Sequence, residues 1–78
     1  MTQIELDPVT FRDVWGFTNV RAASYLGVDV RQFTNYCQGR RSSASVRYLA
    51  ATLTLLWLKE GKRPARAKLL PTWETMAA

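Results

Sequence analysis

The chain has 78 residues, with one Cys, no His, and 11 Lys and Arg against 6 Asp and Glu. A chain of this length holds one small domain, and a hydrophobic fraction of 47% is typical of a folded globule. A single Cys excludes an internal disulfide, and the missing His excludes the usual zinc-ligand sets and the His-activated nucleophiles. We therefore expect that the protein is not an enzyme and that it binds no metal and no cofactor.

The sequence carries no signal for secretion or membrane insertion. Its first ten residues are polar and acidic, unlike a signal peptide. The longest apolar run covers residues 49–58 and includes two Thr, whereas about 20 residues are needed to span a bilayer. These features predict a cytoplasmic protein with no membrane partner and no small-molecule substrate.

The charge is unevenly placed along the chain. Residues 1–29 carry a net charge of −2, and residues 30–78 carry +7. An excess of this kind favours a polyanionic partner, and most of the cations are Arg, which binds phosphates and guanine edges well. The alternative is that the excess charge only keeps a small protein soluble.

Local signals predict two short helices near the start of the chain. Asp7 caps a helix over residues 8–15 that begins with a proline and ends at Gly16. Thr18 caps a second helix over residues 19–26, which a glycine ends. Apolar residues at helical spacing form the inner faces of the two helices: Phe11, Val14, Trp15, Ala22, Ala23 and Leu26.

A third helix is predicted over residues 30–38, with Asp29 as its cap and Gly39 as its end. Gln32 stands three residues after the cap and suggests a capping box. Phe33, Tyr36 and Cys37 fall at helical spacing and are expected to be buried.

The fourth predicted helix runs from a cap at Ser43, with Ser42 and Ser45 as competing caps, to about Glu60 and ends at Gly61. Its expected core face consists of Val46, Leu49, Ala50, Leu53, Leu56 and Trp57. A second apolar stripe consists of Tyr48, Ala51, Leu55 and Leu58. A helix that is apolar nearly all round must be covered on both sides.

Two covers for the second stripe are open: the C-terminal tail or another copy of the chain. We divide the chain into a domain over residues 1–61 and a tail over residues 62–78, which packs on the last helix or at a dimer interface. The tail supplies Leu69, Leu70, Trp73 and Met76. The predicted homodimer interface consists of Tyr48, Leu55, Leu58 and Trp73.

The second and third helices have the spacing of a helix-turn-helix, two short helices joined by a tight turn. The segment over residues 19–41 resembles the helix-turn-helix of Cro/CI-type phage repressors. Its matching framework residues are Ala23, Gly27, Val28, Phe33, Tyr36 and Gly39, and residues 40–43 resemble the basic loop of that family. The resemblance implies an all-α, lambda repressor-like domain of four to five helices with a C-terminal tail. It also implies a homodimeric regulator that reads double-stranded DNA in a bacterial or phage-infected cell.

The same resemblance assigns roles to individual residues. The base-reading residues would be Val30, Arg31, Thr34, Asn35 and Gln38, since Arg suits guanine and Asn or Gln suits adenine. The phosphate-binding residues would be Thr18, Asn19, Arg40, Arg41, Ser42, Ser43 and Arg47. The alternative for these polar residues is an ordinary solvated surface. For Arg63, Arg66 and Lys68, a basic arm on DNA and a solvated linker both stay open.

A second class of function is compatible with the same residues. A helix-turn-helix framework can serve as a small protein-interaction module that binds and inhibits a host or partner protein. The basic face or the apolar fourth helix would then bind the partner protein.

Overall fold

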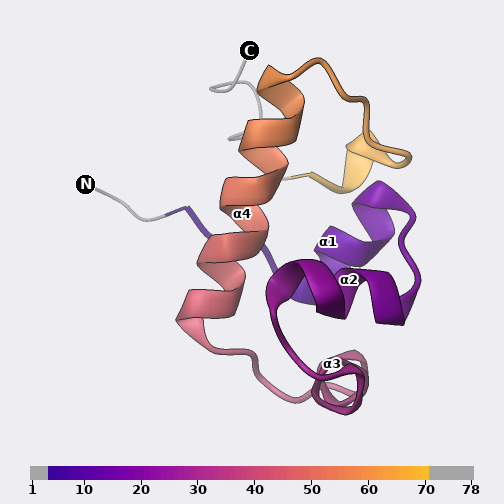
Figure 1. The fold of residues 1–78 in the computed structure, drawn as a ribbon, viewed down its shortest axis with the longest axis vertical. Coiled ribbons are helices and arrows are strands. Elements are labelled where there is room, and N and C mark those ends of the chain that lie inside the picture. The colour runs from indigo at the N-terminus through magenta and orange to yellow at the C-terminus, as the bar shows by residue number, and fades with distance from the viewer. Residues whose placement is uncertain (1–3, 71–78) are drawn as a thin grey trace.

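The computed structural model describes residues 4–70, and in this part of the chain every regular element is helical (Figure 1). The all-α prediction is therefore confirmed. The elements are α1 (Pro8–Trp15), α2 (Asn19–Leu26), α3 (Val30–Cys37), α4 (Ala44–Lys59) and a single 3-10 turn, η1 (Ala67–Leu69).

All four helices begin at the predicted cap residues, and α1 and α2 also end where predicted. The four cap residues are Asp7, Thr18, Asp29 and Ser43. Each cap oxygen accepts a hydrogen bond from a backbone N–H two or three residues further on, which satisfies a donor that the helix itself leaves free. The first two helices end at Gly16 and Gly27, whose φ angles of +70° and +69° favour glycine.

Two details of α3 differ from the prediction. The helix ends at Cys37, one residue earlier than expected, and Gln38 becomes its C-terminal cap. The predicted capping box at Gln32 is wrong, because its Nε2 atom donates a hydrogen bond to Tyr36 Oη across 2.8 Å. This bond lies along the helix at a spacing of four residues, where side chains are neighbours.

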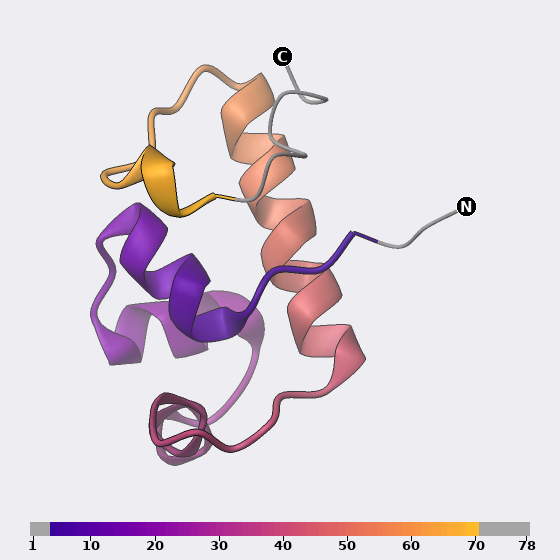
Figure 2. The same ribbon diagram turned by 180° about the vertical axis from the view of Figure 1, so that it is seen from behind.

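The helices pack around one hydrophobic core. α1 contacts α2, α3 and α4, and α4 runs beside α1 and α2, with α3 beyond its first turn (Figures 1 and 2). The core residues are Leu6, Phe11, Ala22, Ala23, Leu26, Phe33, Tyr36, Val46, Ala50, Ala51 and Trp57. The expected inner faces of α2 and of most of α3 are therefore confirmed.

The buried face of α4 is rotated relative to the prediction. Leu56, expected in the core, is 49% exposed, while Ala51, expected on the outer stripe, is buried. Thr54 is fully buried, and its hydroxyl oxygen accepts a hydrogen bond from Trp15 Nε1 across 3.2 Å. This bond joins the indole of α1 to the inward side of α4 and gives the buried hydroxyl of Thr54 a partner.

Cys37 was expected to be a buried apolar residue, and this prediction is wrong. The thiol is exposed, and its sulfur accepts a hydrogen bond from Arg12 Nη1 across 3.2 Å. Cys37 is the last residue of α3, and at this end of the helix its side chain lies at the surface beside α1.

The segment after α4 folds back over α1. Arg66 donates its backbone N–H to the carbonyl of Val14 across 2.9 Å, and Leu70 packs against the core. Leu69 is exposed. The predicted contacts of Trp73 and Met76 lie outside the described residues.

Figure 2 shows η1 beside α1, at the end of the molecule away from α3. Within residues 4–70, no helix is long and apolar enough to cross a membrane.

Candidate nucleic-acid interface

α3 is held by its inner face and presents its outer face to solvent. Phe33 and Tyr36 are buried against α1 and α2. The turn before α3 is closed by a hydrogen bond from Val28 N to Ala23 O across 3.1 Å, and the Val28 side chain packs on the core. This bond and the left-handed Gly27 form a Schellman-type helix end, which fixes the direction in which α3 leaves the turn.

The predicted base-reading residues lie on the exposed side of α3. Arg31 and Gln38 are exposed, and Asn35 is partly exposed. Among the described residues, none forms a hydrogen bond with these three side chains, so their donors and acceptors face solvent.

Two smaller residues complete this face of α3. Val30 is exposed, and the Thr34 hydroxyl donates a hydrogen bond to the Val30 carbonyl across 3.0 Å. Because that hydroxyl proton is used inside the helix, the methyl group is the part of Thr34 best suited to touch a base, such as the methyl of thymine.

The start of α2 carries an oriented amide. Arg12 Nη1 donates to Asn19 Oδ1 across 2.8 Å, and Arg12 Nε donates to Asp13 Oδ1 across 2.9 Å. A guanidinium group can only donate, so the atom of Asn19 that faces Arg12 must be its side-chain oxygen. The amide N–H groups of Asn19 are then available to donate to another acceptor. Sequence reasoning missed Arg12, because its partner lies seven residues away on another helix.

Thr18 serves mainly as the cap of α2. Its hydroxyl oxygen accepts from Arg21 N across 3.2 Å, and its side chain is exposed. The free backbone N–H groups of the first turn of α2 lie beside it, which is the arrangement that suits a phosphate oxygen.

The predicted phosphate-binding residues after α3 fall into two groups. Arg40 and Arg41 are exposed, and Ser43 is exposed but engaged as the cap of α4. Ser42, in contrast, is only 7% exposed. The hydroxyl of Ser42 therefore does not face solvent, and it lies 3.4 Å from Arg47 Nη1, so Ser42 is not among the proposed phosphate contacts.

Arg47 is bound within the protein. Its Nε atom forms an ion pair with Glu5 Oε1 at 3.0 Å, and its Nη1 atom donates to the carbonyl of Ser42. The Arg47 side chain is 18% exposed, and its backbone carbonyl accepts from Leu6 N across 3.1 Å. Arg47 thus ties the N-terminal segment to the start of α4. Glu5, which the sequence did not single out, is its partner.

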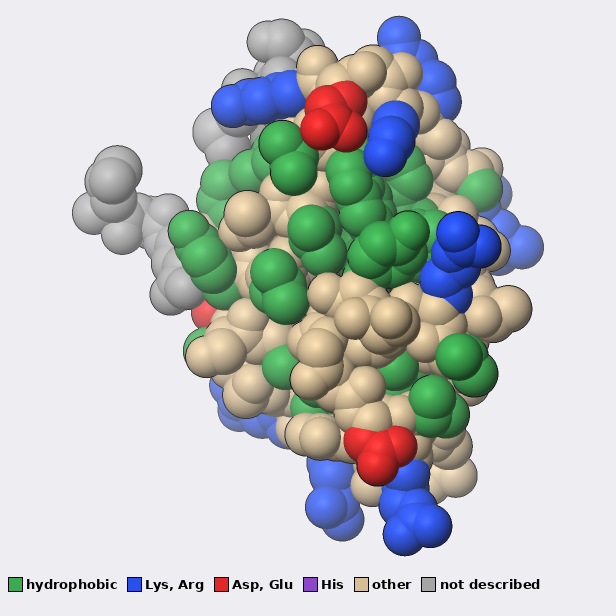
Figure 3. All heavy atoms as spheres, in the orientation of Figure 1, with side chains coloured by type: hydrophobic (Ala, Val, Ile, Leu, Met, Phe, Trp, Pro, Cys, Tyr) green, Lys and Arg blue, Asp and Glu red, His purple; other side chains and the backbone are tan. Residues whose placement is uncertain are grey.

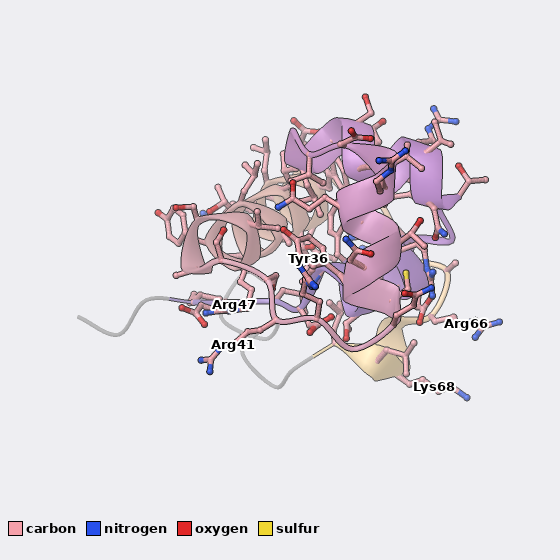
Figure 4. All side chains as sticks on the ribbon, turned by 90° about the horizontal axis from the view of Figure 1, so that it is seen from below. Tyr36, Arg41, Arg47, Arg66 and Lys68 are labelled. Carbon is pink, nitrogen blue, oxygen red and sulfur yellow. The ribbon has the colours of Figure 1, made fainter. Side chains whose placement is uncertain are left out.

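A polar hollow of about 410 Å³ lies between the Arg47–Glu5 ion pair and the basic loop over residues 40–43. It is lined by Glu5, Asp7, Tyr36, Gly39, Arg40, Arg41, Ser42 and Arg47. Figure 4 looks onto α3 and shows Tyr36 and Arg47 on one side of the helix, with Arg41 pointing away from the protein. Arg41 is therefore better placed than Arg47 to reach an external anion.

Arg66 and Lys68 lie on the other side of the view in Figure 4. They are exposed and belong to the segment that packs on α1, and η1 makes no contact with α3 in the described part of the chain. These two cations are therefore separate from the surface around α3.

The predicted dimer residues show different exposure. Tyr48 is 47% exposed, whereas Leu55 and Leu58 are partly buried. Trp73 lies outside the described residues. Leu56 and Tyr48 are the large apolar residues that α4 exposes most.

Figure 3 shows hydrophobic side chains across the upper and middle part of this face. Lys and Arg side chains project around them at the upper end and at the right edge, and others project from the lower end near α3. Within the described ranges, no cluster of acidic or Cys side chains could hold a metal ion.

Comparison with protein-family models, curated proteins and solved structures finds no match for this chain. The function of the surface around α3 therefore has to be argued from its own residues.

Proposed function

We propose that the protein is a sequence-specific, double-stranded DNA-binding transcriptional regulator that reads the major groove with α3. In this proposal α2 and α3 form a helix-turn-helix of the lambda repressor-like kind. The short turn over residues 27–29 and the packing of α2 on α3 support that interpretation.

One observation carries the proposal. The outer side of α3 holds Arg31, Asn35 and Gln38 without protein partners among the described residues, and the exposed Arg40 and Arg41 follow at once. Side chains of these three types form paired hydrogen bonds with guanine and adenine edges. Arginines beside such a helix supply the phosphate contacts that fix its position on the duplex.

The phosphate contacts in this proposal come from both ends of the helix pair. Asn19 offers amide N–H groups at the start of α2, beside Thr18. Arg40 and Arg41 offer guanidinium groups after α3. Two sets of contacts on either side of a groove orient a recognition helix within it.

A homodimer fits the same proposal. The exposed apolar residues Tyr48 and Leu56 lie on one side of α4, and Figure 3 shows hydrophobic side chains gathered in this region. Two copies joined there would present two α3 helices, which is the geometry that reads a palindromic site in half-sites about 34 Å apart.

The test of DNA binding is its dependence on salt. Anisotropy of a labelled duplex should show strong binding at 50 mM salt and a fall in affinity of about a thousandfold by 200 mM, if about six phosphates are neutralised. Absence of duplex binding at 50 mM salt would rule out the proposal.

A second candidate function is favoured by the apolar surface alone. The exposed face of α4 would then bind and inhibit a partner protein in place of a second copy. Binding that leaves the Arg31→Ala and Arg41→Ala variants unaffected, with no duplex binding by the native protein, would support this candidate.

A further inference from the structure

Five aromatic rings form a cluster at the end of the molecule away from α3. Trp57 of α4 lies at its centre, with ring centroids 5.7 Å from Phe11, 5.1 Å from Trp15 and 5.8 Å from Phe17. The Tyr25 ring of α2 lies 5.1 Å from Trp57 and 5.1 Å from Phe17. Edge-to-face and offset pairs at these distances stabilise one another, so the rings hold fixed positions.

The cluster is not closed on its outer side. A cavity of about 360 Å³ opens there, and it is lined by Trp15, Phe17, Tyr25, Trp57, Lys62 and Arg63. This hollow is shallow and open to solvent, and its volume is within the range of small-molecule sites in proteins. Trp15 has already used its indole N–H on Thr54, so it offers the cavity only its apolar ring surface.

The end of α4 places a cation at the cavity. Lys62 N donates to Trp57 O across 3.0 Å and Gly61 N donates to Leu58 O across 3.1 Å, which together form a Schellman motif. Gly61 has the positive φ, +89°, that this motif requires. The turn brings Lys62 Nζ to 5.4 Å from the Trp57 ring centroid, a cation–π contact.

The cations of the cavity are available to an anion. Lys62 is paired with Glu60 at 3.6 Å, but both side chains are at least half exposed, and pairs of this kind contribute little. Arg63 is exposed beside it. No acidic residue lines the cavity within the part of the chain that the structure describes. Four aromatic walls with two adjacent cations therefore complement a flat ring that carries a negative charge.

We propose that this cavity binds a planar aromatic carboxylate of about the size of a bicyclic ring. The ring of the ligand packs against Tyr25 and Phe17, beside the largely buried Trp57. Its carboxylate accepts charge-assisted hydrogen bonds from Lys62 and Arg63. A neutral aromatic compound cannot form the charge-assisted hydrogen bonds, and inorganic phosphate cannot pack against the aromatic rings. The site is independent of the surface around α3.

The probe for this proposal is 1-naphthoate, titrated into the full chain and followed by calorimetry and by the indole N–H signals in NMR spectra. We expect saturable binding that shifts the signals of Trp15 and Trp57. The uncharged 1-naphthamide should bind at least about tenfold more weakly, since it cannot form the charge-assisted bonds. Absence of saturable binding, or equal affinity for the amide, would overturn the proposal.

Two double variants separate the cavity from general charge effects. Lys62→Gln with Arg63→Gln should weaken 1-naphthoate binding about tenfold or more. The matched control, Arg66→Gln with Lys68→Gln, removes the same charge from the η1 segment and should leave the affinity unchanged. Equal losses in both variants would also overturn the proposal. If the first variant does not fold, the comparison of carboxylate with amide on the native chain decides.

Discussion

Arg12 Nη1 donates a hydrogen bond to Asn19 Oδ1 across 2.8 Å, which ties the middle of α1 to the first residue of α2. The guanidinium group is held in turn by Asp13, at 2.8 Å from its Nη2 atom. In the proposed complex this arrangement points the Asn19 amide N–H groups at a phosphate. Arg12 would therefore act through Asn19 and not by its own contact with DNA.

Replacement of Arg12 by Ala should weaken duplex binding about fivefold, because an unoriented amide loses roughly one hydrogen bond. Arg12→Lys keeps the charge but cannot hold both partners, so it should weaken binding nearly as much. Anisotropy titrations at constant salt measure both effects. In an Asn19→Ala background the Arg12→Ala change should add almost nothing. A full additional loss there would mean that Arg12 binds DNA independently.

Arg31 is proposed to contact a base and Arg41 a phosphate, so replacing each by Ala should affect duplex binding differently. Arg31→Ala should reduce discrimination between duplexes by about 1–3 kcal/mol, because it removes a contact to a base edge. Arg41→Ala should weaken all sequences alike and reduce the salt dependence by about one phosphate contact. Titrations of preferred and scrambled duplexes at several salt concentrations distinguish these outcomes. The same pattern of loss for both variants would show that the roles are wrongly assigned.

Arg47 should matter for stability more than for DNA affinity. Arg47→Ala removes the ion pair with Glu5 and the bond to Ser42, so we expect the free energy of unfolding to fall by about 1–3 kcal/mol. Arg41→Ala, on an exposed residue of the loop before α4, is the control and should change the free energy of unfolding by less than about 0.5 kcal/mol. Urea denaturation measures both. A stable Arg47→Ala protein with a large loss of duplex affinity would reverse this assignment.

The hydroxyl of Thr54 should contribute more to the free energy of unfolding than its small volume suggests. Thr54→Val leaves the indole N–H of Trp15 without its acceptor, and we expect a loss of about 1–3 kcal/mol in the free energy of unfolding. Thr52→Val on the exposed side of the same helix is the matched control and should cost less than about 0.5 kcal/mol. Equal effects of the two changes would contradict the structural role given to Thr54.

Dimerisation is tested on the exposed side of α4. Leu56→Lys should give a folded monomer in sedimentation velocity experiments, because it places a charge in the proposed interface without disturbing the core. Thr10→Lys, a partly exposed position on α1, is a control that should leave the association state unchanged. A native protein that is monomeric at micromolar concentration would contradict the proposed dimer.

The helix boundaries could be predicted because their determinants are local. Caps such as Asp7 and Ser43 act on N–H groups two or three residues away, and the glycines that end α1 and α2 relieve a local backbone conformation. The sequence alone contains these relationships. The exposure of Arg31 could also be predicted, because the buried positions of α3 carry aromatic residues and the others do not.

The core face of α4 could not be predicted, because the helix is apolar around most of its circumference and periodicity does not define one direction. Tertiary contacts decide which face is buried, and one of them, the bond between Trp15 and Thr54, joins residues 39 positions apart. The placement of Arg47 depends on Glu5 in the same way, across 42 positions. Long-range pairs of this kind leave no local pattern, so the sequence placed Leu56 in the core and did not reveal the ion pair of Arg47 with Glu5.

Selection of bound duplexes from a random pool decides whether α3 reads a DNA sequence. We expect an enriched palindrome whose half-site centres lie about one helical turn apart, and loss of that enrichment for Arg31→Ala. A pool that stays unenriched after repeated rounds at 50 mM salt would contradict the claim.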